Sequence, residues 1–565
     1  MNQDDDSLDA SRVDHLELEA AGYSQAMPRQ FSTWALGALS FTLTCTWIGT
    51  GASIGIGLTE ASAAGSLWSL VIAGFMTLVV SAGMAELSSA YPVAGAQYYW
   101  SFMVASDKYR PFASYINGWL SVLGWWLASG SVANFVSSLI LTVAAIWHPT
   151  YTPKAWQQYL TYAALVWLAA VLNIFASRLM PIFNKLVSVL SVVTLGATML
   201  TLFIVARHHH APASFIFTDV ASRSGWTNQG FTFLLATGNA VYGFLGTDCG
   251  AHLCEEIVNP SKNVPKVIMY PLVVGTLTAF PFAASLLYAI SDLDAVLGTP
   301  TGLPLLEIYY QGTRSYAAST ILLALFTFCM FGALVAVGES EGKESPLHGN
   351  WMLKSSPGTT CSRTLWAISR DGALPFSHIW MRVDSTWRMP VHSMVLTATC
   401  VSLYGLIFLG STTAFSAMVN AAIMFLQTSC VVPQAILLFR GRDRVLPERY
   451  FSLGKFGVAV NAIAVAWVIF LDVLYCFPTS RPVTPQSMSY VSVVSVGCVT
   501  FVVLLWLTTK KGRFTGPHVD FEVMNERRRI ALRTRLHGVE PEGQANMSNG
   551  RPVLKNGGEA TDRTF

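Results

Sequence analysis

Charged residues are scarce in this chain. Asp, Glu, Lys and Arg make up 12% of its 565 residues, whereas hydrophobic residues make up 52%. Soluble domains carry roughly 25% charged residues, and the mean hydropathy here is +0.46. The shortage of charge excludes a chain of ordinary soluble domains and predicts a polytopic membrane protein. The net charge of +3 is small and indicates no nucleic-acid partner.

Metal-binding motifs and disulfide frameworks are also lacking. The nine cysteines are scattered, most of them within apolar runs, and no two have the spacing of zinc ligands. His208, His209 and His210 adjoin one another, but no carboxylate or cysteine completes a metal site. We therefore expect no metal and no cofactor, and we interpret these histidines as part of a solvated outer loop.

A cleavable signal peptide is lacking as well. Residues 1–30 are acidic and polar, whereas a signal peptide begins with basic residues and continues into a short apolar stretch. We interpret residues 1–30 as a disordered cytoplasmic tail. The membrane segments themselves are then expected to direct targeting.

Long apolar segments, in contrast, are abundant. A helix needs about 20 apolar residues to cross a bilayer. Segments of that length lie at about 34–58, 66–90, 113–147, 156–176, 184–206, 230–255, 267–290, 316–337, 391–410, 413–439, 457–477 and 488–509. The predicted fold is an all-α polytopic membrane protein with about 12 transmembrane helices. Residues 31–510 form this membrane domain, and residues 511–565 form a second tail.

Positive charges gather in alternate loops between these segments. The loop after the tenth segment holds Arg440, Arg442, Arg444, Arg449 and Lys455, whereas no outer loop holds more than two cations. Because cytoplasmic loops are enriched in Lys and Arg, we expect the cation-rich loops to be cytoplasmic. An even number of spans then places both termini in the cytoplasm.

Two segments contain helix-breaking sequences at equivalent positions in the two halves of the chain. The first is glycine-rich over residues 47–57, and the sixth over residues 242–250. Glycine costs a helix interior about 1 kcal/mol relative to alanine. Non-helical backbone at membrane depth is tolerated only where it is buried or lines a wet cavity. A pair of broken helices is therefore the best sequence indication of a secondary transporter's binding site.

We expect the solute to bind at these two breaks, where freed backbone groups and hydroxyls can reach it. The candidate substrate-binding residues are Gly49, Thr50, Gly51, Ser53, Tyr242, Gly243, Phe244, Gly246, Thr247 and Asp248. Plain helix packing through the small residues Gly51 and Gly55 is the alternative. The same stretch matches the G-x-S-x-G motif of hydrolases, but that motif needs a preceding strand. No enzyme is therefore predicted.

Asp248 is an acidic residue deep within the sixth segment. An ionisable residue at that depth is a functional candidate by default, and here it would contact a substrate amine or a coupling proton. Alternatively, Asp248 follows the predicted break and caps the second half-helix, where an acid also suits the positive helix end. The sequence leaves both interpretations open.

Aromatic and acidic residues supply two further candidate groups. An aromatic box around an ammonium group would use Trp47, Trp125, Trp126, Tyr242 and Phe244, although aromatic residues in spans commonly serve packing. Gate or coupling residues at cytoplasmic helix ends would be Glu86, Glu255 and Glu256, paired with Arg370 or Lys266. Simple solvated helix ends are the alternative for these acids.

Several segments resemble those of a known family. Residues 86–100, ELSSAYPVAGAQYYW, are similar to the second-helix signature of fungal amino acid, GABA and choline permeases in the amino acid–polyamine–organocation superfamily. Residues 248–256, DCGAHLCEE, resemble that family's sixth helix, and residues 369–375 and 453–457 match as well. The resemblance runs from about residue 31 to residue 517. Residues 292–304 are closer to the choline-type branch.

The resemblance implies a LeuT-like inverted repeat of five plus five helices, followed by two C-terminal helices. It also implies proton-coupled import of amino acids or related small amines such as GABA or choline, in a fungal plasma membrane, by alternating access. The bilayer and the small solute are the partners expected. A transporter-like nutrient receptor or an inactive paralogue is the alternative function, although the cytoplasmic tail is short for a receptor.

Residues 338–358 depart from this family's pattern. Family members run almost directly from residues like 334–337 to residues like 360–366, whereas here a polar stretch with Glu339, Glu341, Lys343, Glu344 and Lys354 intervenes. Buried charges cost about 2.5 kcal/mol or more each in a bilayer, so the stretch must loop out on the cytoplasmic side. We interpret it as a retained intron, with a genuine loop insertion as the alternative.

Overall fold

The fold is known from a computed structural model, which describes residues 45–519 apart from 149, 177–178, 253, 255–256, 258, 339–359, 385–388, 486 and 518. Within these residues the regular structure is helical and contains no strand. Residues 25–518 form one compact unit, to which all of the described helices belong. The predicted all-α polytopic fold is confirmed.

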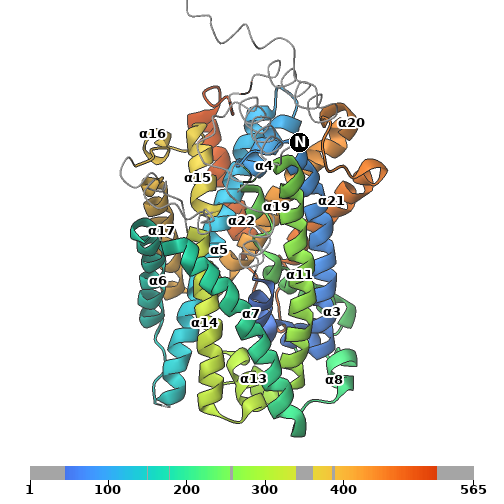
Figure 1. Cartoon of the computed structure of the whole chain (residues 1–565), viewed down its shortest axis with the longest axis vertical. Helices are drawn as coiled ribbons and strands as arrows, with labels where there is room; N and C mark the ends of the chain where they lie inside the picture. Colours follow the sequence, from blue (N-terminus) through green and yellow to red (C-terminus); the bar gives the residue numbers. More distant parts are fainter. Residues whose placement is uncertain are drawn as a thin grey trace, which may run out of the picture. The chain divides into compact units, whose positions relative to one another are not determined.

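Ten helices are long and apolar enough to cross a membrane in the part of the chain that the structure describes. They are α3 (Thr46–Ala90), α5 (Arg110–Trp147), α6 (Ala155–Phe175), α7 (Met180–Val205), α11 (Pro260–Tyr288), α14 (Tyr316–Gly338), α17 (Val391–Gly405), α19 (Thr412–Arg440), α21 (Gly457–Leu474) and α22 (Val491–Leu505) (Figure 1). Hydrocarbon offers no hydrogen-bond partners, so apolar segments of this length satisfy their backbone groups as helices.

α3 contains both the first and the second predicted spans. Ala61 and Ser62 interrupt its helical backbone, with Ser62 at φ 55°. A Cβ atom placed on Gly57 would lie 2.8 Å from the Ser66 hydroxyl oxygen. Nine residues of straight helix would separate such positions by about 13 Å. The chain therefore reverses at the two interrupted residues, and α3 is a helical hairpin.

Asp219 holds the turn of this hairpin in place. Its carboxylate accepts a hydrogen bond from the Ser62 hydroxyl at 2.8 Å, and its carbonyl accepts one from the Ala64 amide at 2.9 Å. The Arg223 amide donates to the Thr59 carbonyl at 2.9 Å. The segment after α7 thus supplies the partners that a two-residue turn leaves without helical bonds.

The sixth predicted span is broken, as the sequence indicated. It consists of α9 (Gln229–Ala240), the 3₁₀ turn η3 (Val241–Phe244) and the short helix α10 (Cys249–His252). Gly246 lies between η3 and α10 at φ +84°, a backbone conformation that residues with a Cβ rarely adopt. With α3 counted as two spans and this broken helix as one, the described helices account for the twelve predicted spans.

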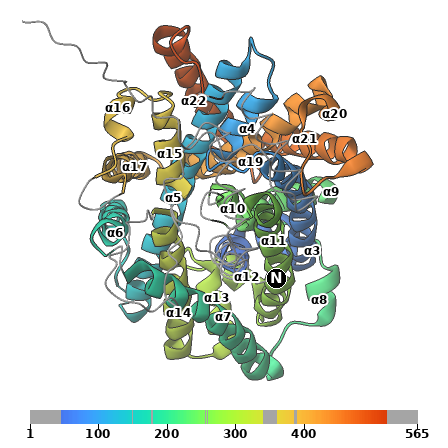
Figure 2. The same cartoon turned by 45° about the horizontal axis from the view of Figure 1, so that its top comes forward.

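Shorter helices connect the spans. They are α4 (Ala96–Val104), η2 (Ala206–His208), α8 (Ala213–Thr218), α12 (Leu293–Leu297), α13 (Pro304–Thr313), α15 (Thr360–Arg370), α16 (Ser377–Trp380), α18 (Ile407–Gly410), α20 (Arg442–Val445), η5 (Gly454–Phe456) and the π-helical turn η6 (Trp506–Lys510). α3 packs along α11 and α9, and α5 packs along α19 and α4. Figure 2 shows α10 beside α11, between these two groups of helices.

Candidate functional site

The backbones of the first and sixth spans touch at a pair of glycines. A Cβ atom on Gly49 of α3 would lie 2.6 Å from the Gly243 Cα atom of η3. In the reverse direction, a Cβ atom on Gly243 would lie 3.3 Å from the Thr46 carbonyl oxygen. Only residues without a side chain permit this approach. The two predicted binding-site segments are therefore in direct contact.

The predicted break in the glycine-rich stretch 47–57 is wrong, because α3 is a continuous helix from Thr46 through this stretch. The hydroxyls of Thr50 and Ser53 donate to the helix carbonyls of Thr46 and Gly49 at 2.8 and 2.9 Å. The described helix begins after its N-cap, Cys45, which is left-handed at φ 40°.

Packing explains why the glycines of the first span do not break it. A Cβ atom on Gly51 would lie 2.9 Å from the Phe326 ring, and one on Gly55 would lie 2.4 Å from the Pro304 ring. Small residues let neighbouring elements approach a membrane helix closely. The small-residue packing alternative is therefore the one that the described structure supports.

The sixth-span residues surround the break. The Phe244 side chain is fully buried, and Thr247 is nearly so. The Tyr242 hydroxyl lies 2.9 Å from the Ser131 hydroxyl of α5, so this side chain reaches across to another span. The left-handed Gly246 then redirects the chain into α10. Gly243, Gly246 and Asp248 thus have three different local roles: close approach, a left-handed backbone conformation and side-chain contact.

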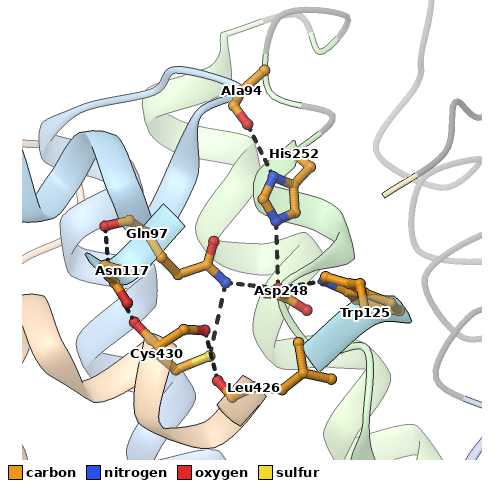
Figure 3. Close-up of polar contacts among 9 residues, drawn as sticks. Ala94, Gln97, Asn117, Trp125, Asp248, His252, Leu426 and Cys430 are labelled. Atoms are coloured by element: carbon orange, nitrogen blue, oxygen red, sulfur yellow. Dashed lines mark hydrogen bonds and ion pairs between the residues drawn. The ribbon is translucent and has the colours of Figure 1, made fainter. Parts of the chain in front are cut away.

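Asp248 is the centre of a buried hydrogen-bond network (Figure 3). Its Oδ2 atom accepts from the Gln97 amide nitrogen of α4 at 2.6 Å and from the Trp125 indole nitrogen of α5 at 3.2 Å. His252 Nε2, one helical turn along α10, lies 3.4 Å from the same oxygen. The Asp248 side chain is 4% exposed. These side-chain contacts, rather than the N-cap of α10, occupy its carboxylate in the described part of the chain.

Asn117 of α5 fixes the surroundings of this network. Its amide nitrogen donates to the Gln97 carbonyl at 2.9 Å, to the Ser101 hydroxyl at 2.7 Å and to the Ser429 carbonyl at 3.1 Å. Gln97 also approaches the Cys430 sulfur of α19 at 3.8 Å. α4, α5 and α19 are thereby tied together directly beside Asp248 (Figure 3).

The predicted aromatic box is not assembled as one cluster. Trp47 is enclosed by the rings of Phe282 and Phe326, at centroid distances of 5.1 and 5.5 Å, and its indole donates to Ser191 at 3.0 Å. Trp125 contacts Asp248 instead. Trp126 faces Thr397, with its indole nitrogen 3.4 Å from that hydroxyl. Among the described residues, Trp125 is the box candidate that contacts the sixth-span acid.

Glu86 forms a buried ion-pair cluster, with partners other than those predicted. Its carboxylate is 1% exposed and accepts from Arg442, from Arg449 at 2.6 Å and from the Leu453 amide at 3.1 Å. The expected pairing with Arg370 or Lys266, and the solvated alternative, are both wrong for Glu86. The physical reason is that the loop between α19 and α21 folds back over the end of α3.

The other predicted gate residues do not join this cluster. Arg370, at the end of α15, lies over the Trp366 ring at 4.7 Å. Glu255 and Glu256 lie outside the described residues.

Four residues of these clusters were missed by sequence reasoning: Gln97, His252, Arg442 and Arg449. His252 could have been found, because residues four apart lie on one face of a helix. No local signal connects Gln97 with Asp248, since they are 151 positions apart. Glu60 was missed too, because it lies two residues beyond the first predicted span, 34–58. It is 2% exposed, and its Oε2 atom has no hydrogen-bond partner in the described structure.

The fold and this site define a class of protein. Membrane-length helices surround a broken span, and a buried carboxylate lies beside the break, which is the arrangement of a polytopic membrane transporter. Comparison with known families gives the same class: the model of the amino acid permease family matches residues 31–338 and 358–504. This chain belongs to the amino acid permease family, and it is a transporter rather than an enzyme.

Curated relatives from fungi and plants cover most of the chain. A choline transporter of Saccharomyces cerevisiae is 29% identical over 486 residues, which span 86% of this chain and 82% of that protein. Amino-acid permease 2 of Neurospora crassa is 30% identical over 513 residues, 88% of each. Amino-acid permease BAT1 of Arabidopsis thaliana is 27% identical over 520 residues, 90% of this chain and 96% of its own length. The family resemblance read from the sequence is confirmed.

The family model leaves a gap at the predicted insertion, since residues 339–357 are not matched. Residues 339–359 also lie outside the described structure. The interpretation of residues 338–358 as a retained intron stays a prediction. Sequencing of spliced transcripts tests it, and transcripts that mostly contain the segment would establish a genuine loop insertion instead.

Proposed function

We propose that this chain imports amino acids or related small amines, choline and GABA among them, by proton-coupled alternating access. The observation that carries the proposal is the break in the sixth span with the buried Asp248 beside it. Support for the solute class comes from relatives named as a choline transporter and as amino-acid permeases. An amino acid and choline share one feature, a cationic nitrogen, which a buried carboxylate attracts.

The solute would bind where the first and sixth spans meet. Residues 245–248 lie between η3 and α10. The Gly246 and Asp248 carbonyls accept hydrogen bonds within this turn at 3.1 and 2.9 Å, and the other backbone groups of the turn are the ones that would contact a polar solute. The Gly49–Gly243 contact holds the first span against this break. Asp248 supplies negative charge, Trp125 an aromatic ring, and Tyr242 a hydroxyl at the adjoining span. Backbone and side chains from both halves of the fold thus converge on one place.

Transport would follow from movement around this site. Spans one and six would rock against the remaining helices and open the site to one side of the membrane at a time. The cation-rich loop between α19 and α21 supports a cytoplasmic position for that end of the helices. We place both termini in the cytoplasm and the protein in the plasma membrane.

Uptake into proteoliposomes tests this function. Purified protein would be reconstituted, an inwardly directed proton gradient imposed, and accumulation of labelled choline, GABA and a panel of L-amino acids measured. We expect at least one of these solutes to accumulate, and a protonophore to abolish the accumulation. Liposomes without protein are the control. If every solute in the panel stays at the control level, in both uptake and exchange, the alternative of a receptor or inactive paralogue replaces this proposal.

A further inference from the structure

We infer that Asp248 and His252 hold one proton between them, and that this pair is the proton-binding site of the transport cycle. The inference rests on the proposed function, which it deepens by naming the residues that carry the proton. Both side chains are buried: that of Asp248 is 4% exposed and that of His252 is 1% exposed. Their atoms Oδ2 and Nε2 are 3.4 Å apart.

The hydrogen bond to Ala94 determines which histidine nitrogen carries hydrogen. His252 Nδ1 lies 2.9 Å from the Ala94 carbonyl oxygen (Figure 3). A carbonyl oxygen only accepts hydrogen bonds, so Nδ1 must be the donor. In neutral imidazole the second nitrogen is then an acceptor with a lone pair. That lone pair is directed at Asp248, whose ionised carboxylate is also an acceptor.

Two acceptors cannot form a hydrogen bond, so the contact needs one more proton. If the proton is on His252, an imidazolium donates to the Asp248 carboxylate. If it is on Asp248, the carboxylic acid donates to neutral His252 Nε2. In both arrangements the pair binds one proton beyond the Nδ1 hydrogen and is electrically neutral. Neutrality favours this state at membrane depth, where an unpaired charge is costly.

The other partners of Asp248 cannot exchange protons near neutral pH. The Gln97 amide and the Trp125 indole are fixed donors. From α19, the titratable group near the pair is Cys430, whose sulfur is 3.8 Å from the Gln97 amide nitrogen. His252 is therefore the partner of Asp248 whose ring nitrogen can either donate or accept a hydrogen bond.

The elements packed against α10 bring further charged groups. α11 carries Lys262, which lies over the Tyr450 ring, and also Lys266. α15 carries Arg370, which lies over Trp366. The Tyr98 hydroxyl of α4 donates to Asp371, just beyond α15. Cys249 and Cys254 flank the pair on its own segment, and Glu255 and Glu256 follow outside the described residues.

Loss of the proton would change how the sixth span is held. With Asp248 ionised and His252 neutral, the lone pair and the carboxylate repel each other across the contact. The carboxylate meanwhile keeps its charge-assisted bonds to Gln97 of α4 and Trp125 of α5, which are about twice as strong as neutral ones. Proton binding and release therefore alter the contact between Asp248 and His252, and with it how α10 is held between the Ala94 carbonyl and the carboxylate that Gln97 and Trp125 fix. That is the coupling that a proton-driven alternating-access cycle requires.

Two conservative variants test the pair, Asp248→Asn and His252→Gln. In proteoliposomes we expect each to lower gradient-driven accumulation of labelled choline, or of whichever panel solute the wild type accumulates, by at least about tenfold, equivalent to ~1.4 kcal/mol in the limiting step. Exchange of labelled for unlabelled solute without a gradient should persist in His252→Gln, and its rate should no longer depend on pH. Asp248→Glu, which keeps a titratable group, should restore part of the accumulation.

Asp472→Asn and His209→Gln are the matched controls, and both should accumulate solute as the wild type does. Asp472 is a partly buried acid of α21 that contacts Thr428, and His209 contacts the Gln311 carbonyl. If Asp248→Asn and His252→Gln keep gradient-driven accumulation, the pair is not the proton site, although the transporter function stands. If exchange by folded His252→Gln disappears together with accumulation, His252 is needed for solute binding rather than for proton coupling, and the inference is also wrong.

A measurement on the wild type keeps the inference testable if either variant fails to fold. Solute binding to unbuffered protein in detergent should change the bound proton count, which a pH-indicator dye reports. We expect up to one proton per solute bound. Solute binding at a constant affinity from about pH 5 to pH 8, with no proton exchanged, would overturn the inference. Absence of both binding and transport would instead reject the underlying transporter function.

Discussion

The first and sixth spans are both rich in glycine, yet only one of them is broken in the described structure. Residues 46–60 of α3 are helical, whereas the sixth span changes from α9 through η3 to α10. The difference lies in what each glycine accommodates. Gly49, Gly51 and Gly55 make room for neighbouring atoms, whereas Gly246 adopts φ +84°. Glycine density alone therefore does not locate an unwound turn.

The comparison also separates two physical contributions to one site. The first span supplies a close-packed surface, and the sixth supplies a change of chain direction and a buried acid. Substitution by alanine tests the two separately, because alanine is favourable in a helix but adds a Cβ atom. At Gly49 the added Cβ atom would contact backbone, and at Gly51 it would contact a side chain. At Gly246 it would destabilise the left-handed backbone conformation.

Gly49→Ala should have the largest effect. The new Cβ atom would lie 2.6 Å from the Gly243 Cα atom, and backbone atoms cannot rotate away. We expect destabilisation of about 3 kcal/mol, the upper end of typical overpacking costs, together with loss of uptake. Thermal unfolding in detergent, followed by tryptophan fluorescence, measures it. A wild-type unfolding midpoint would mean that the two spans are not in contact at these glycines.

Gly246→Ala should have the next largest effect, through backbone strain. A left-handed conformation costs a residue with a Cβ roughly 1–2 kcal/mol. Gly246→Asn should be the milder change, because asparagine tolerates this conformation better. Unfolding midpoints of the two variants give the measurement. Equal effects of Ala and Asn would indicate that the space around Gly246, rather than its φ angle, is what matters.

Gly51→Ala should have a smaller effect than either of these substitutions. Its Cβ atom would meet the Phe326 ring at 2.9 Å and the Phe282 ring at 3.3 Å, and side chains can shift where backbone cannot. We expect about 1 kcal/mol of destabilisation, the lower end of the overpacking range, with uptake retained. If Gly51→Ala destabilised the protein more than Gly49→Ala, the expectation that a clash with backbone costs more than a clash with a side chain would be wrong.

Ser53→Ala should have the smallest effect. Its hydroxyl donates to the Gly49 carbonyl of its own helix at 2.9 Å, and such internal bonds are worth little to a helix. We expect stability within about 0.5 kcal/mol of wild type, as for other minor substitutions, and unchanged affinity for the transported solute. A clear loss of solute affinity in competition assays would instead show that the Ser53 hydroxyl contacts the solute.

The order of the spans and the break in the sixth could be predicted from sequence, because both depend on local properties. The length of the apolar segments predicts the spans, and the glycines on either side of Phe244 and Leu245 predict the break. The partners of Asp248 and Glu86 could not be predicted in this way. Gln97 is 151 positions from Asp248, and Arg442 is 356 positions from Glu86. Contacts over such separations depend on the packing of whole helices, which a single sequence does not encode locally.

The first span illustrates the other reason for error. Its glycines were interpreted as a break because helix propensity disfavours them, but tertiary packing overrides propensity in a buried helix. Phe326 and Pro304 fill the space that the missing side chains leave. Their positions in the fold could not be read from residues 47–57 alone. The sequence was therefore compatible with small-residue packing as well as with a helix break, and it could not decide between them.

The hairpin within α3 has a consequence for how the protein is made and engineered. Only Ala61 and Ser62 separate its two spans, and Asp219 occupies the hydrogen-bonding groups of the turn. A connecting loop of ordinary length is absent between these spans, so the pair would enter the bilayer as one unit during synthesis. Insertions are tolerated where backbone is exposed and unbonded. An epitope tag or protease site placed at this turn should therefore block assembly, and topology mapping needs other loops.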